Sequence, residues 1–230
     1  TLLHRPYGET VMGIHAMYRD LINIPDSTAR AEKAEEIKAF ARKHKDRRLE
    51  LNVDFFLVFW NAFFLNQPKE ISHRALVELV ERSTKENVDF LRARSLRALA
   101  EFYWKIEKNY QRAFEQYLLL DNEISAANPK DYPEMARDLM QIGKAYYFFH
   151  DYPLAIKYFK RAIALPENTF TTGVINDARN TLGLSYQQLG RLDSADYYFN
   201  RVLETKFAES AAWKRVAIGN LGADLYLGGH

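Results

Sequence analysis

Six histidines, at positions 4, 15, 44, 73, 150 and 230, are the residues of this sequence best suited to metal or acid–base chemistry. Two metal ligands on one face of a helix call for a spacing of four residues, and no two of these histidines have that spacing. The sequence contains no cysteine and so offers no thiolate ligand, cysteine nucleophile or disulfide bond. It also lacks a glycine-rich phosphate-binding motif. We therefore expect no metal site, no catalytic residue and no cofactor.

Acidic side chains are the next candidates for chemistry. Glu32, Glu35 and Glu36 could supply paired carboxylates for acid–base catalysis. They are interspersed with Lys33 and Lys38, however, and alternating charges on an alanine-rich helix are typical of a solvated face. We interpret this segment as helix surface.

A basic cluster lies at 41–48, with cations at Arg42, Lys43, Lys45, Arg47 and Arg48. Cations are favourable near the C-terminus of a helix, and no aromatic residues alternate with these to stack on bases. The net charge of +2 is also too small to attract nucleic acid or anionic lipid in general. The sequence therefore favours no nucleic-acid partner, and a nucleic-acid-associated helical repeat stays a lesser alternative.

The elements that position these residues are helices. Apolar residues recur at three- and four-residue spacing nearly throughout, whereas the alternation of a β-strand is almost absent. We predict an all-α fold of about eleven helices, with breaks at 23–27, 66–72, 128–134, 150–153, 165–173 and 189–193. Asp26 and Ser27 can cap one helix, and Asp131 with Glu134 resembles a capping box that has Pro133 in its first turn.

The most apolar segment, at 54–65, is too short to cross a membrane. It contains only about a dozen residues, against the roughly 20 that a helix needs to span a bilayer. We expect a buried helix there and no membrane insertion within this chain.

Two stretches forty residues apart share one pattern: GKAYYFFHDYPLAIKYFKRA at 143–162 and GLSYQQLGRLDSADYYFNRV at 183–202. They agree at Gly143/Gly183, Tyr146/Tyr186, Ala155/Ala195, Tyr158/Tyr198, Phe159/Phe199 and Arg161/Arg201. A glycine on one helix and an alanine twelve residues later let two helices approach closely, and the aromatic residues fill the space beside them. One hairpin cannot bury both apolar stripes, so a second copy supplies the missing surface. The pattern predicts a row of antiparallel helical hairpins.

Weaker copies lie on both sides of these two. At 101–120, the residues Trp104, Tyr110, Ala113 and Tyr117 fall 42 positions before Tyr146, Tyr152, Ala155 and Phe159. At 220–229, Gly222 and Gly229 fall 39 positions after Gly183 and Gly190. The dipeptide His150-Asp151 stands where the other copies have Gly190-Arg191 and Lys108-Asn109, so we interpret it as a hairpin turn and not as an acid/base pair.

These residues resemble the tetratricopeptide repeat family. The segments IGKAY at 142–146 and LGLSY at 182–186 match the first part of its motif, and AIKYFKRA at 155–162 matches the second. The spacings of 42, 40 and 39 exceed the family's usual 34, and they fall near the periods of HEAT and armadillo repeats. The glycine-to-alanine pattern favours the tetratricopeptide repeat. The resemblance implies a right-handed superhelical solenoid of antiparallel helical hairpins.

The expected organisation has two parts. Degenerate helical hairpins occupy 1–90, and repeats occupy about 91–130, 135–166 and 175–207, with a partial copy at 211–230. A partial copy leaves an apolar stripe without a second helix, so we expect the chain to be a fragment of a longer protein.

The resemblance also implies a function, because the first helices of this family line a groove that receives a peptide or helix of a partner protein. Counting from the matched glycines, the expected groove residues are Lys105, Arg137, Met140, Lys144, Tyr147, Asp177, Asn180, Leu184, Gln187 and Gln188. Some family members grip a terminal carboxylate through paired Lys and Asn. Lys144 and Asn180 are only a remnant of that clamp, and Leu184 stands where it needs another polar residue, so we do not expect a carboxylate clamp.

We expect a non-enzymatic protein- or peptide-binding module within a larger signalling or regulatory protein, with an effector domain beyond His230. Such a sensor would lie outside the cytoplasm, in a bacterial periplasm for example. The alternatives are a free-standing scaffold for a multiprotein complex, in the cytoplasm or elsewhere, and a helical-bundle enzyme. The last would need inward clusters of carboxylate and histidine, which the sequence does not show.

Overall fold

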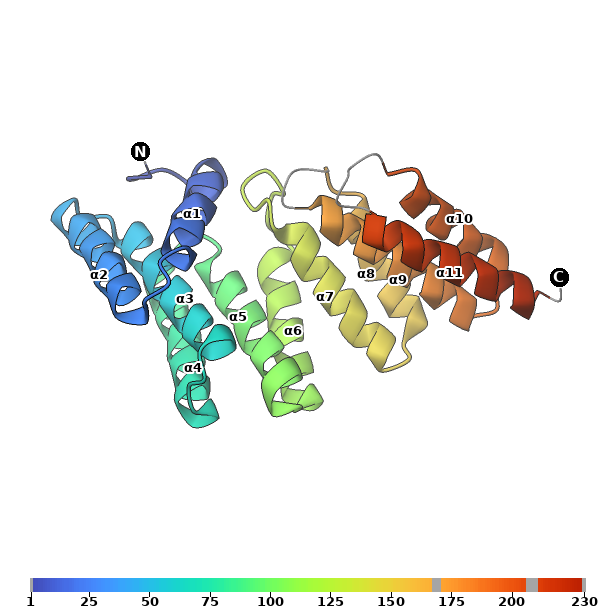
Figure 1. Cartoon of the computed structure of the whole chain (residues 1–230), viewed down its shortest axis with the longest axis horizontal. Coiled ribbons are helices and arrows are strands. Elements are labelled where there is room, and N and C mark those ends of the chain that lie inside the picture. The colour runs from blue at the N-terminus through green and yellow to red at the C-terminus, as the bar shows by residue number, and fades with distance from the viewer. Residues whose placement is uncertain (1, 167–170, 206–210, 229–230) are drawn as a thin grey trace. The chain divides into compact units, whose positions relative to one another are not determined.

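The computed structural model describes residues 2–166, 171–205 and 211–228. Within these ranges the chain is helical and contains no strand (Figure 1). The described part of the chain contains helices α1 to α11, in agreement with the number expected from the apolar periodicity. Parts of the predicted break at 165–173, and Gly229, lie outside the described residues. The chain forms two compact units, Thr1–Tyr132 and Pro133–His230.

The first unit contains the helices α1 (Tyr7–Ile22), α2 (Ser27–Lys43), α3 (Arg47–Phe64), α4 (Lys69–Glu86), α5 (Leu91–Phe102) and α6 (Tyr110–Ile124). A short π-helical segment, Tyr103–Glu107, follows α5. Each helix from α2 to α5 packs on the next one along the chain.

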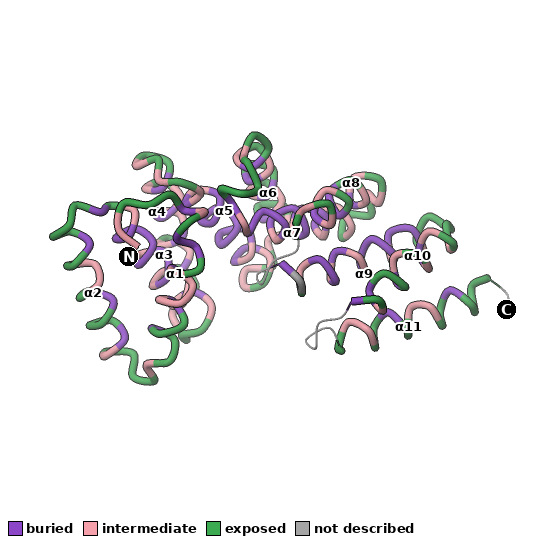
Figure 2. The backbone as a smooth tube through the Cα atoms, turned by 90° about the horizontal axis from the view of Figure 1, so that it is seen from above, coloured by how far each residue is buried: buried purple, intermediate pink, exposed green. Residues whose placement is uncertain are grey.

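The second unit contains α7 (Met135–Phe148), α8 (Tyr152–Ile163), α9 (Thr172–Gln188), α10 (Leu192–Leu203) and α11 (Ala211–Leu227). Here too each helix packs on the next, and α7 and α11 also pack on α9. Buried positions follow the sides on which neighbouring helices face each other, as the purple stretches of Figure 2 show. The helices alternate as the sequence predicts, so that α7–α8 and α9–α10 are the two hairpins with matched glycine and alanine. The expected all-α repeat fold is therefore confirmed, and the boundary proposed near residue 90 stays a prediction.

One turn geometry recurs in four hairpins. A residue with positive φ occupies the turn in each case: Lys45, Lys108, His150 and Gly190. The backbone N–H of the following residue then donates to a carbonyl in the last turn of the preceding helix, from Asp46 to Ala41, Asn109 to Tyr103, Asp151 to Tyr146 and Arg191 to Tyr186. The predicted turn at His150-Asp151 is therefore confirmed. The α2–α3 hairpin shares this turn although its sequence shows no repeat.

The turn after α5 contains one extra residue. Its hydrogen bond from Asn109 to Tyr103 spans six positions, whereas the bond from Asp151 to Tyr146 spans five. The π-helical segment Tyr103–Glu107 accommodates the difference, because a π-turn holds one residue more than an α-turn.

This insertion changes the alignment of the first helix. Trp104 aligns with Tyr146 in the sequence, but the turn shows that the structural counterpart of Tyr146 is Tyr103. The counterpart of Gly143 is then Ala100, which is fully buried and also small. A small residue therefore lies at this hairpin crossing as well.

In the described part of the chain, an Asp or Asn side chain caps the start of four helices, α2, α3, α6 and α8. The Asp26 side chain accepts from the N–H of Ala29 at 2.7 Å and caps α2 as expected. The capping box expected at Asp131 and Glu134 does not form, because α7 begins at Met135 and its cap residue makes no side-chain cap bond.

Tyr132 lies three residues before the start of α7. It is fully buried and stacks on Phe90 with 4.7 Å between ring centroids. Its backbone N–H and that of Asp131 both donate to the carbonyl of Asn128, so the segment before α7 is a turn.

Candidate protein-binding surface

The hairpins of the second unit are held by contacts between a glycine and a phenylalanine. A Cβ atom built on Gly143 would lie 2.8 Å from the Phe159 ring, and one on Gly183 would meet Phe199 in the same way. Both rings are fully buried, which stabilises each hairpin by about 2–3 kcal/mol per ring. The predicted close approach is therefore confirmed. Because Gly143 and Gly183 face their second helices, the helical period sets which way the other residues of α7 and α9 face.

Side-chain pairs then link the first helices of successive hairpins. Lys144 on α7 forms an ion pair with Asp177 on α9, with 2.5 Å between Nζ and Oδ2. The Gln187 amide on α9 donates to Asp224 on α11 at 2.6 Å. The α7, α9 and α11 helices thus present a common face that carries linked polar groups.

The expected groove residues divide by exposure. Met140 and Asn180 are buried, and the side-chain Oδ1 of Asn180 accepts from the side-chain amide of Asn220 on α11 at 2.8 Å. The partly exposed positions are Arg137, Lys144, Tyr147, Asp177, Leu184 and Gln187, while Gln188 is exposed. A partner could therefore reach Tyr147, Leu184 and Gln188 directly.

Tyr147 is the aromatic residue of this face. Its ring packs edge-on against Tyr152, with 5.6 Å between centroids. Burial raises the pKa of the Tyr147 hydroxyl, and the neighbouring Tyr152 raises it further, so this hydroxyl stays neutral and can donate a hydrogen bond.

Lys105 is the one expected groove residue in the first unit. It lies in the π-helical segment and forms an ion pair with Glu101 at 2.6 Å. Its ammonium group is exposed, so the pair adds little to stability.

Two residues of the α7, α9 and α11 face were not expected from the sequence. Asn220 and Asp224 lie in the partial repeat and contact α9. In the sequence this repeat is marked by glycines that follow those of the preceding repeat by 39 residues. Their contacts with α9 depend on how helices pack, which the repeat spacing does not reveal.

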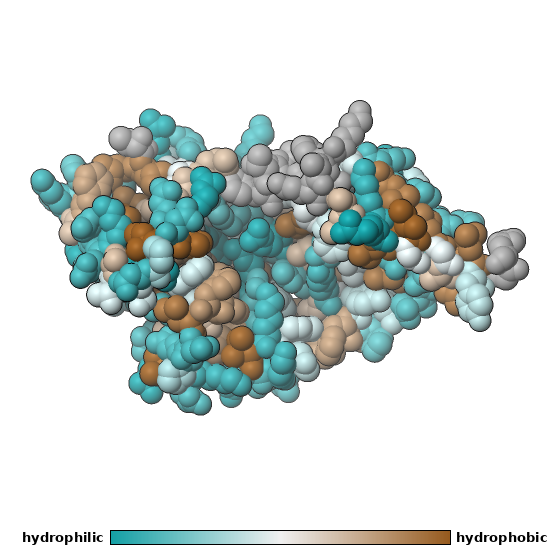
Figure 3. Space-filling view, in the orientation of Figure 1, coloured by the Kyte–Doolittle hydropathy of each residue, from teal (hydrophilic) through white to brown (hydrophobic). Residues whose placement is uncertain are grey.

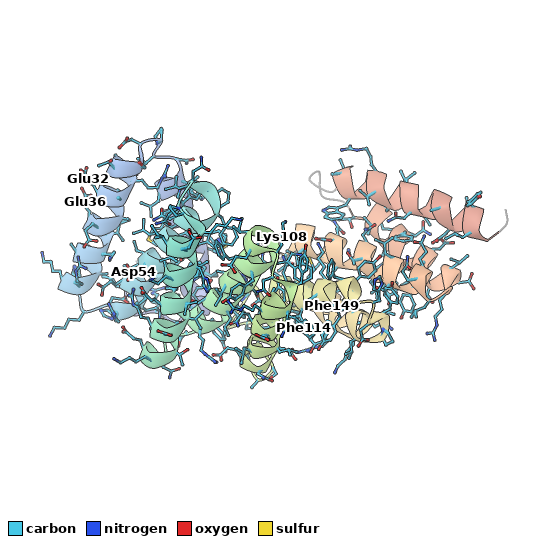
Figure 4. All side chains as sticks on the ribbon, turned by 90° about the horizontal axis from the view of Figure 1, so that it is seen from below. Glu32, Glu36, Asp54, Lys108, Phe114 and Phe149 are labelled. Atoms are coloured by element: carbon cyan, nitrogen blue, oxygen red, sulfur yellow. The ribbon has the colours of Figure 1, made fainter. Side chains whose placement is uncertain are left out.

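The acidic and basic clusters form ion pairs on the helix surfaces. Lys33 pairs with Glu36 at 2.6 Å, and Glu35 pairs with both Lys38 and Arg42. Glu32 and Glu36 lie on the outer side of α2 in Figure 4, as expected for a solvated face.

The arginines of the basic cluster also have acidic partners. Arg47 pairs with Glu50 at 2.7 Å and with Glu86, while Arg48 pairs with Asp89 at 2.9 Å. Only the cations at 42 and 43 lie in the last turn of a helix, because α3 begins at Arg47. Much of the positive charge at 41–48 is thus neutralised locally.

His73 stands three residues after Glu70, a Glu-x-x-His spacing that binds metal in some helical bundles. Its ring contacts Glu107 at 3.1 Å and the Tyr103 hydroxyl at 3.2 Å. Among the described residues, no group of three or more His, Asp or Glu side chains is arranged to hold a metal ion. His73 therefore connects α4 to the segment after α5.

No helix in the described ranges is both long enough and apolar enough to cross a membrane. The apolar segment at 54–65 forms the C-terminal part of α3 and ends at its cap residue, Leu65. Phe55, Phe56 and Ala62 are buried, but Phe64 and Leu65 are exposed, so the expected burial holds for only part of the segment.

A stack of antiparallel helical hairpins with small-to-aromatic crossings defines a helical repeat protein. Residues 177–208 match the tetratricopeptide repeat family model, and the fold of the chain is that of a tetratricopeptide-like repeat. The resemblance seen in the sequence is therefore confirmed.

Among solved structures, the fold is similar to a Q17M form of nearly identical TPR-like repeats from Podosopora anserina, described as a kinesin light chain. The TM-score is 0.55 at 16% sequence identity, and the match covers 86% of this chain and 95% of the other. No curated protein matches this chain in sequence. At this identity the likeness concerns the fold alone.

Proposed function

We propose that residues 133–230 bind a segment of a partner protein on the face shared by α7 and α9, and that the chain is a non-enzymatic binding module of a larger signalling or regulatory protein. Tetratricopeptide repeats generally mediate protein–protein interactions.

The ion pair between Lys144 and Asp177 is the observation that carries the proposal. It joins two first helices across their shared face, with 37% of the lysine side chain still exposed. An aromatic ring at Tyr147, an aliphatic side chain at Leu184 and an amide at Gln188 lie on the same two helices. A peptide needs such a combination of apolar contact and hydrogen bonding, held on rigid elements.

A display library of random peptides tests this proposal, because it assumes nothing about the natural partner. Peptides selected on the whole chain should bind the Leu184→Asp and Tyr147→Ala variants about tenfold more weakly or worse, since each change removes an apolar contact.

The matched control is Leu118→Asp on α6, which changes another exposed leucine in the same way. It should leave the affinity for the selected peptides unchanged, and thermal melting should show that all three variants stay folded. Equal affinity of the Leu184→Asp, Tyr147→Ala and wild-type chains would place binding elsewhere and refute the proposal.

A further inference from the structure

Within the described ranges, other helices cover α11 on one side only. It packs on α9 and α10 through buried positions that include Ala217 and Asp224. Figures 2 and 4 show α11 at the edge of its unit, with α9 and α10 on the same side of it. Ile218, Leu225 and Tyr226 are 60%, 57% and 84% exposed, respectively. Hydrophobic surface is visible along α10 and α11 in Figure 3.

The exposed side of α11 is a copy of the surface that each complete hairpin buries. Gly222 follows Gly183 by 39 residues, and Gly183 follows Gly143 by 40. A Cβ atom on either of the first two glycines would meet a phenylalanine ring of the second helix. Around Gly222, no atom of the described residues lies within 4 Å of the same position.

The residues beside Gly222 continue this correspondence. Leu225 stands three positions later, where the complete hairpins have Tyr146 and Tyr186. Those tyrosines stack on Tyr158 and Tyr198 of their second helices, with centroid distances of 5.3 and 5.7 Å. The second helix therefore supplies two adjacent aromatic residues: one ring packs on the glycine, and the other stacks on the residue three positions after that glycine.

Charge indicates a further property of the occupant. Arg215 is exposed on the same side of α11 as Gly222, and Lys214 lies next to it. In the described part of the chain, neither cation has an acidic partner. The acid of α11, Asp224, is buried on the side facing α9. An occupant with acidic residues would complement this charge.

We propose that the face of α11 formed by Arg215, Ile218, Gly222 and Leu225 binds one amphipathic helix of a partner protein, which carries a small residue, aromatic residues three and four positions after it, and acidic side chains. The interface continues the series of contacts already formed by α7 with α8 and by α9 with α10. It lies on the side of α11 turned away from α9 and α10, and it does not depend on the function proposed for the α7–α9 face.

The probe is a fluorescein-labelled synthetic peptide of residues 191–205, which includes Ala195, Tyr198 and Phe199. An isolated helix of this length is marginal in water, so the peptide should become helical only when bound. Fluorescence polarisation with the whole chain should show saturable binding. The same peptide with Phe199→Ala should bind about tenfold more weakly or worse, because it lacks the ring that covers the glycine.

Two alanine variants of α11 test where the peptide binds. Gly222→Ala places a methyl group where the peptide ring should pack, and it should weaken binding about tenfold or more. Gly219→Ala is the matched control, with the same gain in helix propensity. The counterparts of Gly219 in the complete hairpins are Met140 and Asn180, so this position tolerates a side chain. The Gly219→Ala variant should therefore bind the peptide as tightly as the unmodified chain does. Circular dichroism confirms that α11 stays helical in both.

Each remaining outcome would overturn the proposal. Absence of saturable binding would mean that the face does not accept such a helix. Equal binding by the Gly222→Ala and Gly219→Ala variants would mean that the peptide binds elsewhere, for example in place of α10. A dimer in sedimentation analysis that Gly222→Ala dissociates would identify a second copy of the chain as the occupant.

Discussion

Lys38 on α2 and Asp54 on α3 form an ion pair, 2.8 Å from Nζ to Oδ1, at the hairpin position that Gly143 and Phe159 occupy between α7 and α8. Both pairs are separated by sixteen residues, and their turns share one hydrogen-bond pattern. The α2–α3 hairpin thus has the repeat geometry with a charged crossing in place of an apolar one. Asp54, labelled in Figure 4, also accepts from Arg82 of α4 at 2.5 Å.

The Asp54 carboxylate should make the first unit sensitive to acid. Burial alone would raise the pKa of Asp54, but the hydrogen bonds from Lys38 and Arg82 outweigh it, and the pKa lies below its ordinary value of 3.8. A depressed pKa contributes stability above the ordinary carboxyl range, and this stability is lost as the pH falls through the folded-state pKa.

Asp54→Asn should therefore lower the free energy of unfolding by about 2 kcal/mol near neutral pH, because it removes charge-assisted hydrogen bonds from two cations. Urea titrations at several pH values measure this difference, which should shrink in acid. Glu35→Gln is the control, since Glu35 also pairs with Lys38 but is exposed. An Asp54→Asn penalty that persists unchanged in acid would contradict the assignment to charge.

A methyl group at Gly143 should destabilise the second unit. Alanine is the better helix former by about 1 kcal/mol, yet its Cβ would lie 2.8 Å from the Phe159 ring. We expect Gly143→Ala to cost about 1–3 kcal/mol, as overpacked cores do. A double-mutant cycle with Phe159→Leu should show that the smaller side chain recovers part of this loss. Additive effects would mean that the two residues do not compete for the same space.

Asp196 on α10 should loosen the packing of α11 as the pH rises. Burial raises the pKa of the Asp196 carboxyl, and a hydrogen bond and the charge of Asp224 raise it further. A raised pKa contributes stability below the ordinary carboxyl range and loses it as the pH rises through the folded-state pKa. Hydrogen exchange of α11 amides, corrected for the intrinsic pH dependence, should therefore show more protection in mild acid.

The neutral variant Asp196→Asn should keep this protection at neutral pH, because an amide can donate to the Asp224 carboxylate without repelling it. Asp193→Asn is the matched control on the same helix, where the side chain is exposed. If protection of α11 is the same in Asp196→Asn and Asp193→Asn, repulsion between the two carboxylates is not what loosens the helix.

The turn at Lys108 should gain stability from glycine. Lys108 has φ of 58° and an exposed side chain, and the left-handed conformation costs a non-glycine residue about 1 kcal/mol. Lys108→Gly should raise the free energy of unfolding by about that amount. The reverse change at the equivalent turn, Gly190→Ala, should lower it by a similar amount, because φ there is 68°. Chemical denaturation measures both, and opposite signs are required.

The sequence alone determined the hairpins of the second unit. Their glycine, alanine and aromatic residues recur at fixed spacing, and a helical period of 3.6 residues places them on one face whatever the rest of the chain does. The turns at His150 and Gly190 were predictable for the same reason, because turn residues act over four or five positions. The expected groove residues follow from that register, although their role stays a prediction.

Only the tertiary structure decided which polar groups meet. The pairing of Lys38 with Asp54, of Lys144 with Asp177 and of Gln187 with Asp224 joins different helices, and no local pattern indicates such contacts. The α2–α3 hairpin was not recognisable as a repeat because charged residues lie at its helix crossing. The feature that it shares with the other hairpins is the backbone conformation of its turn, which the sequence does not show. The extra residue of the π-helical segment was equally invisible, because an insertion shifts a sequence alignment without marking where the backbone accommodates it.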